Sequence, residues 1–220
     1  MHDSAKPVIL PDDVIKVLSS DARISKVELS GSRARGEATP LSDWDFAVTA
    51  SQFDEVRDAL PQTVRPLHPV VAQWDRLSPI WCYMLILPGP AKVDLLFSHP
   101  HQPQGPWVVT ASTLAGIDGH FWDWALWLQS KLAASRHDMV AIELRKMHEH
   151  LLAPMGVTSA PTSLADAVTA YRDARDECEH RLRTRVTRSA EDTVIPVLRP
   201  QPEADPAPDS RPRPQWSSDG

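Results

Sequence analysis

Two strand-like segments near the N-terminus constrain the fold of this chain more than any other feature. The first ends at Gly31 and Ser32, and the second carries Asp43 and Asp45 at its start. Because side chains two apart on a strand point to the same face, Asp43 and Asp45 are expected to project together. Two carboxylates about 4 Å apart repel each other by roughly 4 kcal/mol at an effective dielectric constant near 20. A fold tolerates that repulsion when a cation or a shared proton relieves it, so the pattern predicts a metal site.

The residues between the two strands suit a phosphate group. Gly31 lets the backbone approach a ligand closely, and Ser32 adds a hydroxyl donor at the start of a short basic helical segment. Carboxylates for a metal next to a turn for phosphate together indicate a nucleotide site.

The complete pattern resembles the signature of the nucleotidyltransferase superfamily. It consists of Gly31-Ser32, then Arg33-Ala34-Arg35-Gly36, then Ser42-Asp43-Trp44-Asp45. More narrowly, it resembles the branch that contains aminoglycoside and lincosamide nucleotidyltransferases and the minimal nucleotidyltransferases. The resemblance implies a third carboxylate on a neighbouring strand, and Asp94 lies in an apolar run that fits this place.

The resemblance also implies roles for individual residues. It makes Asp43, Asp45 and Asp94 the catalytic residues and the ligands of Mg²⁺, with two ions expected, and Asp94 a general base. It implies that an NTP co-substrate is bound by Gly31, Ser32, Arg35 and Ser42. From the residues alone, Arg35 could equally brace the loop, Arg33 is expected to be solvated, and Asp94 could be an edge-strand residue that faces water.

The activity that the resemblance implies is the transfer of a nucleoside monophosphate, AMP from ATP, to a hydroxyl of a small molecule. An aminoglycoside-like antibiotic, and hence antibiotic resistance, is the natural expectation. The alternative is a toxin–antitoxin type or regulatory nucleotidyltransferase that modifies a protein partner. The partner ribonucleases of such proteins carry an arginine, then four to six residues, then a histidine. Arg145 to His150 and Arg175 to His180 have this spacing.

The patterns along the chain predict an α+β fold in three parts. Residues 1–107 are expected to form the catalytic domain, a mixed β-sheet flanked by helices, with strands at 24–29, 44–48, 70–74, 80–87 and 92–97 and a helix that Pro61 stops. Residues 108–190 show three amphipathic helical patterns, which predict a helical bundle. The resemblance implies that this bundle binds the acceptor. Residues 191–220 are crowded with proline and are expected to be a disordered tail.

Several side chains of the predicted bundle have two interpretations. Trp122, Trp124 and Trp127 could stack on a flat acceptor, although tryptophans of a small bundle more often fill its core. Glu143 could be an additional base if its side of the helix borders the cleft, or otherwise a solvated flank.

Charge and cysteine content limit the remaining function classes. The formal net charge of −6 argues against broad nucleic-acid binding, which needs a basic surface. The chain has two widely spaced cysteines, no apolar run of membrane-spanning length and no signal-peptide pattern. We therefore expect a cytoplasmic protein without membrane association, which could act as a homodimer.

Overall fold

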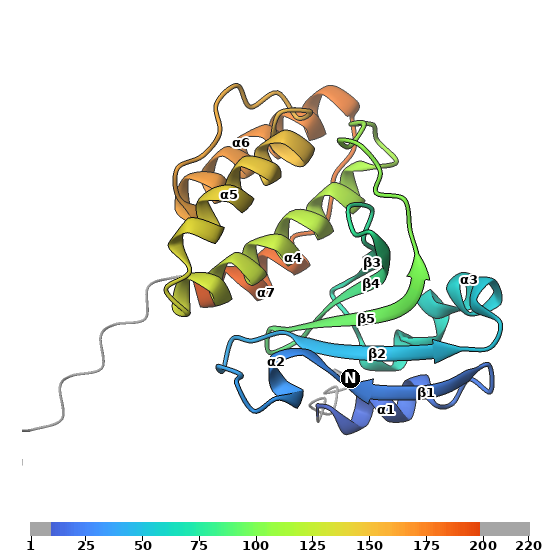
Figure 1. Cartoon of the computed structure of the whole chain (residues 1–220). Helices are drawn as coiled ribbons and strands as arrows, with labels where there is room; N and C mark the ends of the chain where they lie inside the picture. The colour runs from blue at the N-terminus through green and yellow to red at the C-terminus, as the bar shows by residue number, and fades with distance from the viewer. Residues whose placement is uncertain (1–9, 199–220) are drawn as a thin grey trace, which may run out of the picture.

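A computed structural model of the chain describes residues 10–198 and has an α+β fold, as the sequence predicts (Figure 1). The N-terminal part, here called the sheet half, alternates helices and strands. Its elements are α1 (Asp12–Leu18), β1 (Ile24–Leu29), α2 (Gly31–Ala34), β2 (Trp44–Ala50), α3 (Phe53–Thr63), the 3₁₀ turn η1 (Arg65–Leu67), β3 (Val71–Trp74), β4 (Ile80–Leu87) and β5 (Ala91–Pro100).

The five strands form one mixed sheet in the order β1-β2-β5-β4-β3. Strands β2 and β5 are parallel, and the other neighbours are antiparallel. In the parallel pair Asp45 lies opposite Asp94. The topology thus brings two carboxylates that are far apart in sequence to adjacent positions near the centre of the sheet.

Both faces of the sheet are covered, which is why the inner strand β4 is an almost continuous apolar run. Tyr83, Leu85 and Leu87 point to one face and pack with α1 and α3. Ile86 points to the opposite face and packs with the helices that follow the sheet. The face occupied by the helices of the C-terminal part is also the face on which the site described below lies.

The C-terminal part, here called the helical half, contains α4 (Leu114–Ala133), α5 (His137–Met147), the π-helical turn η2 (His148–Leu152), α6 (Leu164–Leu182) and α7 (Ser189–Leu198). Figure 1 shows α4 between the sheet and the other helices. The core of this half includes Val71 and Ile86 of the sheet, so the two halves share buried surface. Ser163 caps α6 by accepting a hydrogen bond from the Asp166 amide at 3.0 Å. Within residues 10–198, no helix combines the length and apolar character needed to cross a membrane.

Two expected boundaries are wrong. Helix α3 continues past Pro61 to Thr63, because Leu60 and Val64 on either side of that proline are both fully buried. Residues 191–198, expected in the tail, belong to α7, in which the buried Ala190 and Val194 lie one turn apart and pack in the helical core. The rest of the expected tail, residues 199–220, lies outside the described residues.

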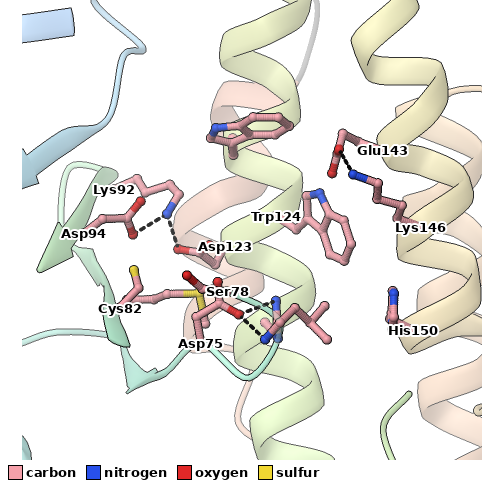
Figure 2. Close-up of a pocket in the computed structure, with 14 residues that line it drawn as sticks. Asp75, Ser78, Cys82, Lys92, Asp94, Asp123, Trp124, Glu143, Lys146 and His150 are labelled. Carbon is pink, nitrogen blue, oxygen red and sulfur yellow. Dashed lines mark hydrogen bonds and ion pairs between the residues drawn. The ribbon is translucent and has the colours of Figure 1, made fainter. Parts of the chain in front are cut away.

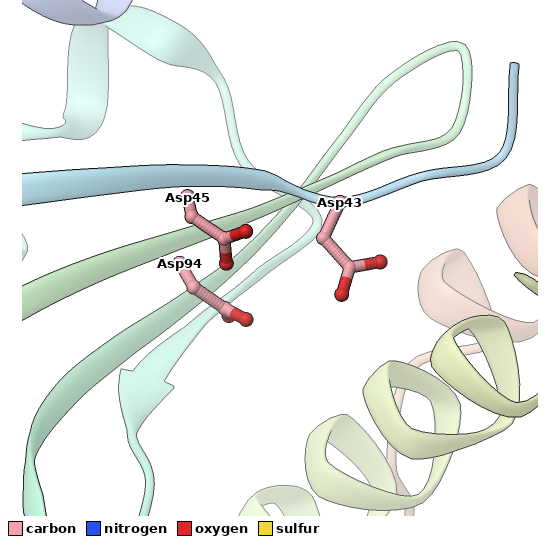
Figure 3. A group of neighbouring side chains, drawn as sticks. All are labelled: Asp43, Asp45 and Asp94. Atoms are coloured by element: carbon pink, nitrogen blue, oxygen red, sulfur yellow. The ribbon is translucent and has the colours of Figure 1, made fainter. Parts of the chain in front are cut away.

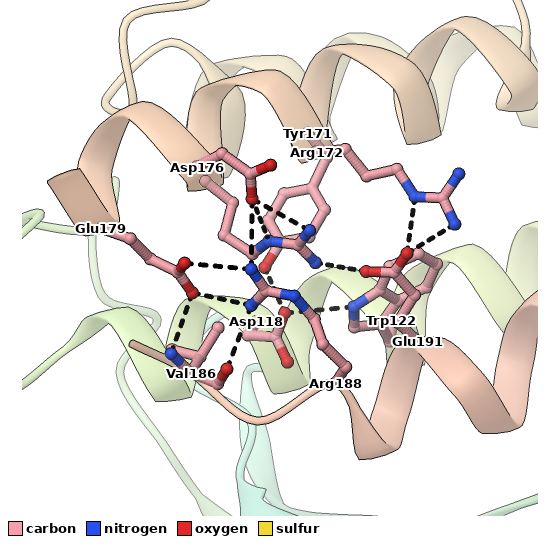
Figure 4. Close-up of polar contacts among 10 residues, drawn as sticks. Asp118, Trp122, Tyr171, Arg172, Asp176, Glu179, Val186, Arg188 and Glu191 are labelled. Carbon is pink, nitrogen blue, oxygen red and sulfur yellow. Dashed lines mark hydrogen bonds and ion pairs between the residues drawn. The ribbon is translucent and has the colours of Figure 1, made fainter. Parts of the chain in front are cut away.

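A polar network joins α6 to α4 and α7 to α6 (Figure 4). The buried carboxylate of Asp118 on α4 accepts hydrogen bonds from the Tyr171 hydroxyl at 2.5 Å and from the Trp122 indole at 3.1 Å. Glu191 at the start of α7 pairs with Arg172 and Arg175 of α6. These pairs explain why α7 is held as a helix although it contains a proline. They also show that Arg175, the arginine of one of the two Arg–His spacings noted above, contacts Glu191 between two helices.

Replacing Tyr171 by phenylalanine tests this network. The variant keeps the stacking on Phe121, whose ring centroid lies 3.8 Å away, and removes only the donor to Asp118. A buried acceptor that loses a hydrogen-bond donor destabilises the folded state by about 1–3 kcal/mol. In a chain of this size such a loss lowers Tm by roughly 2–10 °C. Differential scanning calorimetry measures this change, and a shift below 1 °C would contradict the assigned role.

Candidate active site

Three carboxylates converge at the N-terminal end of β2, on the face of the sheet toward the helical half (Figure 3). Asp43 immediately precedes β2, Asp45 lies within β2 and Asp94 lies on the neighbouring β5. One oxygen of each carboxylate lies within 4.8 Å of the others. The alternative of a water-facing edge residue does not hold for Asp94, because β5 lies between β2 and β4.

The turn after β1 is built around Asp45. Gly31 has a φ of +64°, and a Cβ at this position would lie 1.9 Å from Asp45 Oδ2. The Ser30 amide also donates to the Asp45 carbonyl at 2.7 Å. Glycine is therefore required at position 31 for two reasons, the left-handed backbone and the close approach to a carboxylate.

The electrostatics of the cluster favour a bound cation. Burial, together with the charge of Asp94, raises the pKa of both Asp43 and Asp45. Asp43 Oδ1 is buried and has no hydrogen-bond partner among the described residues. An orphaned carboxylate oxygen beside two further carboxylates matches the hard oxygen ligands that Mg²⁺ prefers. The residues present therefore fit a divalent metal ion.

The loop between α2 and β2 is held mainly by Arg33. Its guanidinium donates to the carbonyls of Ser42 and Asp43 and stacks on the Trp44 ring at 3.9 Å. The expectation of a solvated Arg33 is thus wrong, because the loop carbonyls and the indole engage its side chain. Arg35 is exposed and pairs with Glu37 at 2.7 Å, which agrees with a loop-bracing role.

The two serines expected at the nucleotide differ in their surroundings. Ser32 is half-buried in the first turn of α2. The Ser42 hydroxyl accepts from the Thr39 amide at 2.8 Å and lies 3.1 Å from the Thr39 hydroxyl, inside the loop. Ser32 therefore has the freer hydroxyl for a ligand.

A cavity of about 500 Å³ extends from Asp94 to α5 (Figure 2). Its wall on the sheet side includes Lys92 and Asp94, and its opposite wall includes Glu143, Lys146 and His150. The lining is acidic and aromatic: it contains Asp75, Asp94, Asp123, Glu143, Trp124 and Trp127. Trp122, by contrast, is fully buried and bonded to Asp118. The structure thus brings two of the three tryptophans and Glu143 to the cavity and places Trp122 in the core.

Some lining residues had not been singled out from the sequence. Lys92 is buried and forms ion pairs with Asp94 at 2.6 Å and with Asp123 at 3.1 Å. Burial raises the pKa of Asp123 to about 7, and burial lowers that of His120 to about 4. A usable signal did exist for Asp123, since an aspartate inside an otherwise apolar helix segment needs a buried partner.

The carboxylate cluster agrees with a comparison with protein families. The family model of the nucleotidyltransferase domain matches residues 12–71, a span that includes Gly31, Ser32, Asp43 and Asp45. Residues 12–71 are therefore similar to a nucleotidyltransferase domain.

Similarity to individual proteins is weak. A comparison with curated proteins finds no match. Among solved structures, an aminoglycoside 6-adenyltransferase from Bacillus subtilis is similar over 84% of this chain and 94% of that chain, with 11% sequence identity and a TM-score of 0.30. A likeness at this level carries no information about the substrate.

Proposed function

We propose that this protein is a nucleotidyltransferase that moves AMP from ATP to a hydroxyl of a small molecule that binds in the cavity beside Asp94. The observation that carries the proposal is that Asp94 belongs both to the three-carboxylate cluster and to the lining of that cavity. A nucleotide at the cluster and an acceptor in the cavity would lie next to each other. Holding two reactants in this way supplies a large part of the rate enhancement of a bimolecular reaction.

Each residue of the cluster then has a task. Asp43, Asp45 and Asp94 would hold Mg²⁺, and the turn at Gly31 and Ser32 would hold the β- and γ-phosphates, with Ser42 and Arg35 at its margin. Bound Mg²⁺, as one ion or two, would supply charge stabilisation for the attacking and leaving oxygens.

The reaction balances as a single displacement. The acceptor oxygen forms a bond to the α-phosphorus, the bond from that phosphorus to the bridging oxygen breaks, and pyrophosphate leaves. Two of the four carboxylates that border the cavity can take the hydroxyl proton. Asp94 is at the cluster, and Glu143 is on the opposite wall, where it pairs with Lys146 at 2.7 Å.

The lining of the cavity favours an acceptor that carries ammonium groups. Four carboxylates face only two lysines there, so the wall retains negative charge when both lysines are paired. Trp124 and Trp127 add flat apolar faces, which attract cations and ring systems. An aminoglycoside-like antibiotic combines these features with free hydroxyls.

The test is a label-transfer assay with purified protein, Mg²⁺ and ATP labelled at the α- or the γ-phosphate. The acceptors are an aminoglycoside, the same compound with its amines acetylated, and total protein. We expect α-label on the aminoglycoside, γ-label in pyrophosphate, and at least a tenfold lower rate with the acetylated compound, because a lost charge-assisted contact costs about 1.5–3 kcal/mol.

Three results would contradict parts of this account. Label on protein alone would favour the alternative of a protein-modifying enzyme. Equal rates with both forms of the acceptor would contradict the charge argument. Transfer that persists in Asp43→Asn and Asp45→Asn would contradict the assigned site.

A further inference from the structure

Lys92 connects the carboxylate cluster to the helical half. Its Nζ lies 2.6 Å from Asp94 Oδ1 on β5 and 3.1 Å from Asp123 Oδ1 on α4 (Figure 2). The side chains of Lys92 and Asp123 are each 6% exposed, and that of Asp94 is 15% exposed. A single ammonium therefore joins a strand of the catalytic site to a helix of the other half.

Packing alone does not account for these buried charges. Removing a lysine and an aspartate from water costs free energy, and apolar residues of similar size often stabilise a core as well or better. Apart from His120, the near neighbours of Asp123 on α4 are apolar, and Phe121, Trp122 and Ala125 are fully buried. Asp123 Oδ1 makes no well-aligned hydrogen bond within the described residues, so its contact with Lys92 is an ion pair without further support.

The geometry limits what Lys92 can do. Lys92 and Asp94 are two apart on β5 and point to the same face of the sheet. Because the ammonium contacts Oδ1 of Asp94, it fixes the plane of that carboxylate and leaves the other oxygen unoccupied by Lys92. It also offsets part of the repulsion that Asp94 feels from Asp43 and Asp45.

We infer that Lys92 and Asp123 are a positioning pair for the third carboxylate: Lys92 orients Asp94, and Asp123 holds Lys92 in place from α4. The inference rests on the proposed function of the carboxylate cluster. It makes the helical half a contributor to the catalytic centre as well as a wall for the acceptor.

The test uses the double variant Lys92→Met/Asp123→Asn. This variant replaces the ammonium of Lys92 and the carboxylate of Asp123 together by neutral side chains of similar size, so the formal net charge is unchanged and Asp94 alone loses a partner. Calorimetry is expected to show a folded protein. A change in Mn²⁺ affinity, followed by electron paramagnetic resonance without nucleotide or acceptor, then reports the position of Asp94.

We expect Mn²⁺ affinity to fall about fivefold or more in the double variant. We also expect kcat for label transfer to fall about 10–100-fold, because a small misplacement of a reacting group can cost on the order of 10²-fold in rate. The KM for ATP should stay within about threefold of wild type. The matched control is Arg57→Met/Asp54→Asn, which removes an exposed pair on α3 and should leave both quantities unchanged. A double variant whose Mn²⁺ affinity and kcat both lie within twofold of wild type would overturn the inference.

The single variants show whether the two residues act together. If Asp123 acts through Lys92, Asp123→Asn lowers kcat in the wild-type background and has no further effect in the Lys92→Met background. Decreases that multiply would contradict the pair. Mn²⁺ affinity is measured without substrates, so it tests the Lys92–Asp123 pair even if the wild-type protein transfers no label. A wild-type protein that transfers no label would count against the proposed function and not against the pair.

Discussion

Asp45→Asn is expected to abolish nucleotidyl transfer and, at the same time, to stabilise the metal-free protein. The variant removes a ligand of the proposed metal site, and the loss of several kcal/mol of transition-state stabilisation corresponds to a rate on the order of 10³-fold lower. It also removes one of three carboxylates whose oxygens lie within 4.8 Å of one another. We expect a gain on the order of 1 kcal/mol, or about 2–4 °C in Tm.

The pH dependence of that gain follows from the direction of the pKa shift. Burial and the charge of Asp94 raise the pKa of Asp45 above the ordinary value of an aspartate, so ionisation of Asp45 opposes folding once the pH exceeds that ordinary value. The stabilisation by Asp45→Asn should therefore be present at pH 7 and largely disappear below about pH 3.5.

Differential scanning calorimetry with and without Mg²⁺ measures both effects of Asp45→Asn. Mg²⁺ should raise the Tm of the wild-type protein and have little effect on the variant, since only a ligand that binds the folded state stabilises it. Asp54→Asn, an exposed aspartate on α3, is the control and should change neither Tm nor activity. A wild-type Tm that is insensitive to Mg²⁺ and unchanged by Asp45→Asn would contradict the metal site.

Gly31→Ala is expected to remove most of the activity at a modest cost in stability. The new Cβ would lie 1.9 Å from Asp45 Oδ2 and 3.1 Å from Asp45 Cβ, so the carboxylate must rotate away and the backbone must yield slightly. The displaced ligand would lower kcat by about 10²-fold or more. The stability cost is the strain of alanine at positive φ, about 1–2 kcal/mol.

Gly36→Ala separates the two effects of Gly31→Ala. Gly36 also has a positive φ, +73°, but nothing lies within 4 Å of a Cβ at that position. Both variants should therefore lose similar stability in urea titrations, and only Gly31→Ala should lose activity. Equal activity losses would show that backbone strain, and not displacement of Asp45, is the cause.

The local parts of this site could be predicted from sequence because they follow from short-range geometry. The turn at Gly31 and the shared face of Asp43 and Asp45 depend only on backbone conformation and strand periodicity. Asp94 was predicted as the third carboxylate because it lies in an apolar strand-like run and because the sequence resembles nucleotidyltransferases. Its pairing opposite Asp45 then follows from the parallel register of β2 and β5.

The rest depended on tertiary packing. Lys92 and Asp123 meet only because α4 lies across the end of β5, and no local pattern specifies that contact. Helix α7 was missed because the prolines dominated the composition, whereas the buried Ala190 and Val194 decide its conformation. Arg33 resembled a solvated residue because the loop carbonyls it binds come from residues nine and ten positions away.

A crystal structure with Mn²⁺ and a non-hydrolysable ATP analogue tests the central claim most directly. The account predicts anomalous density for Mn²⁺ between Asp43, Asp45 and Asp94, with the triphosphate against the turn at Gly31 and Ser32 and its α-phosphate facing the cavity. Mn²⁺ bound elsewhere, or a triphosphate that lies away from these three carboxylates, would contradict it.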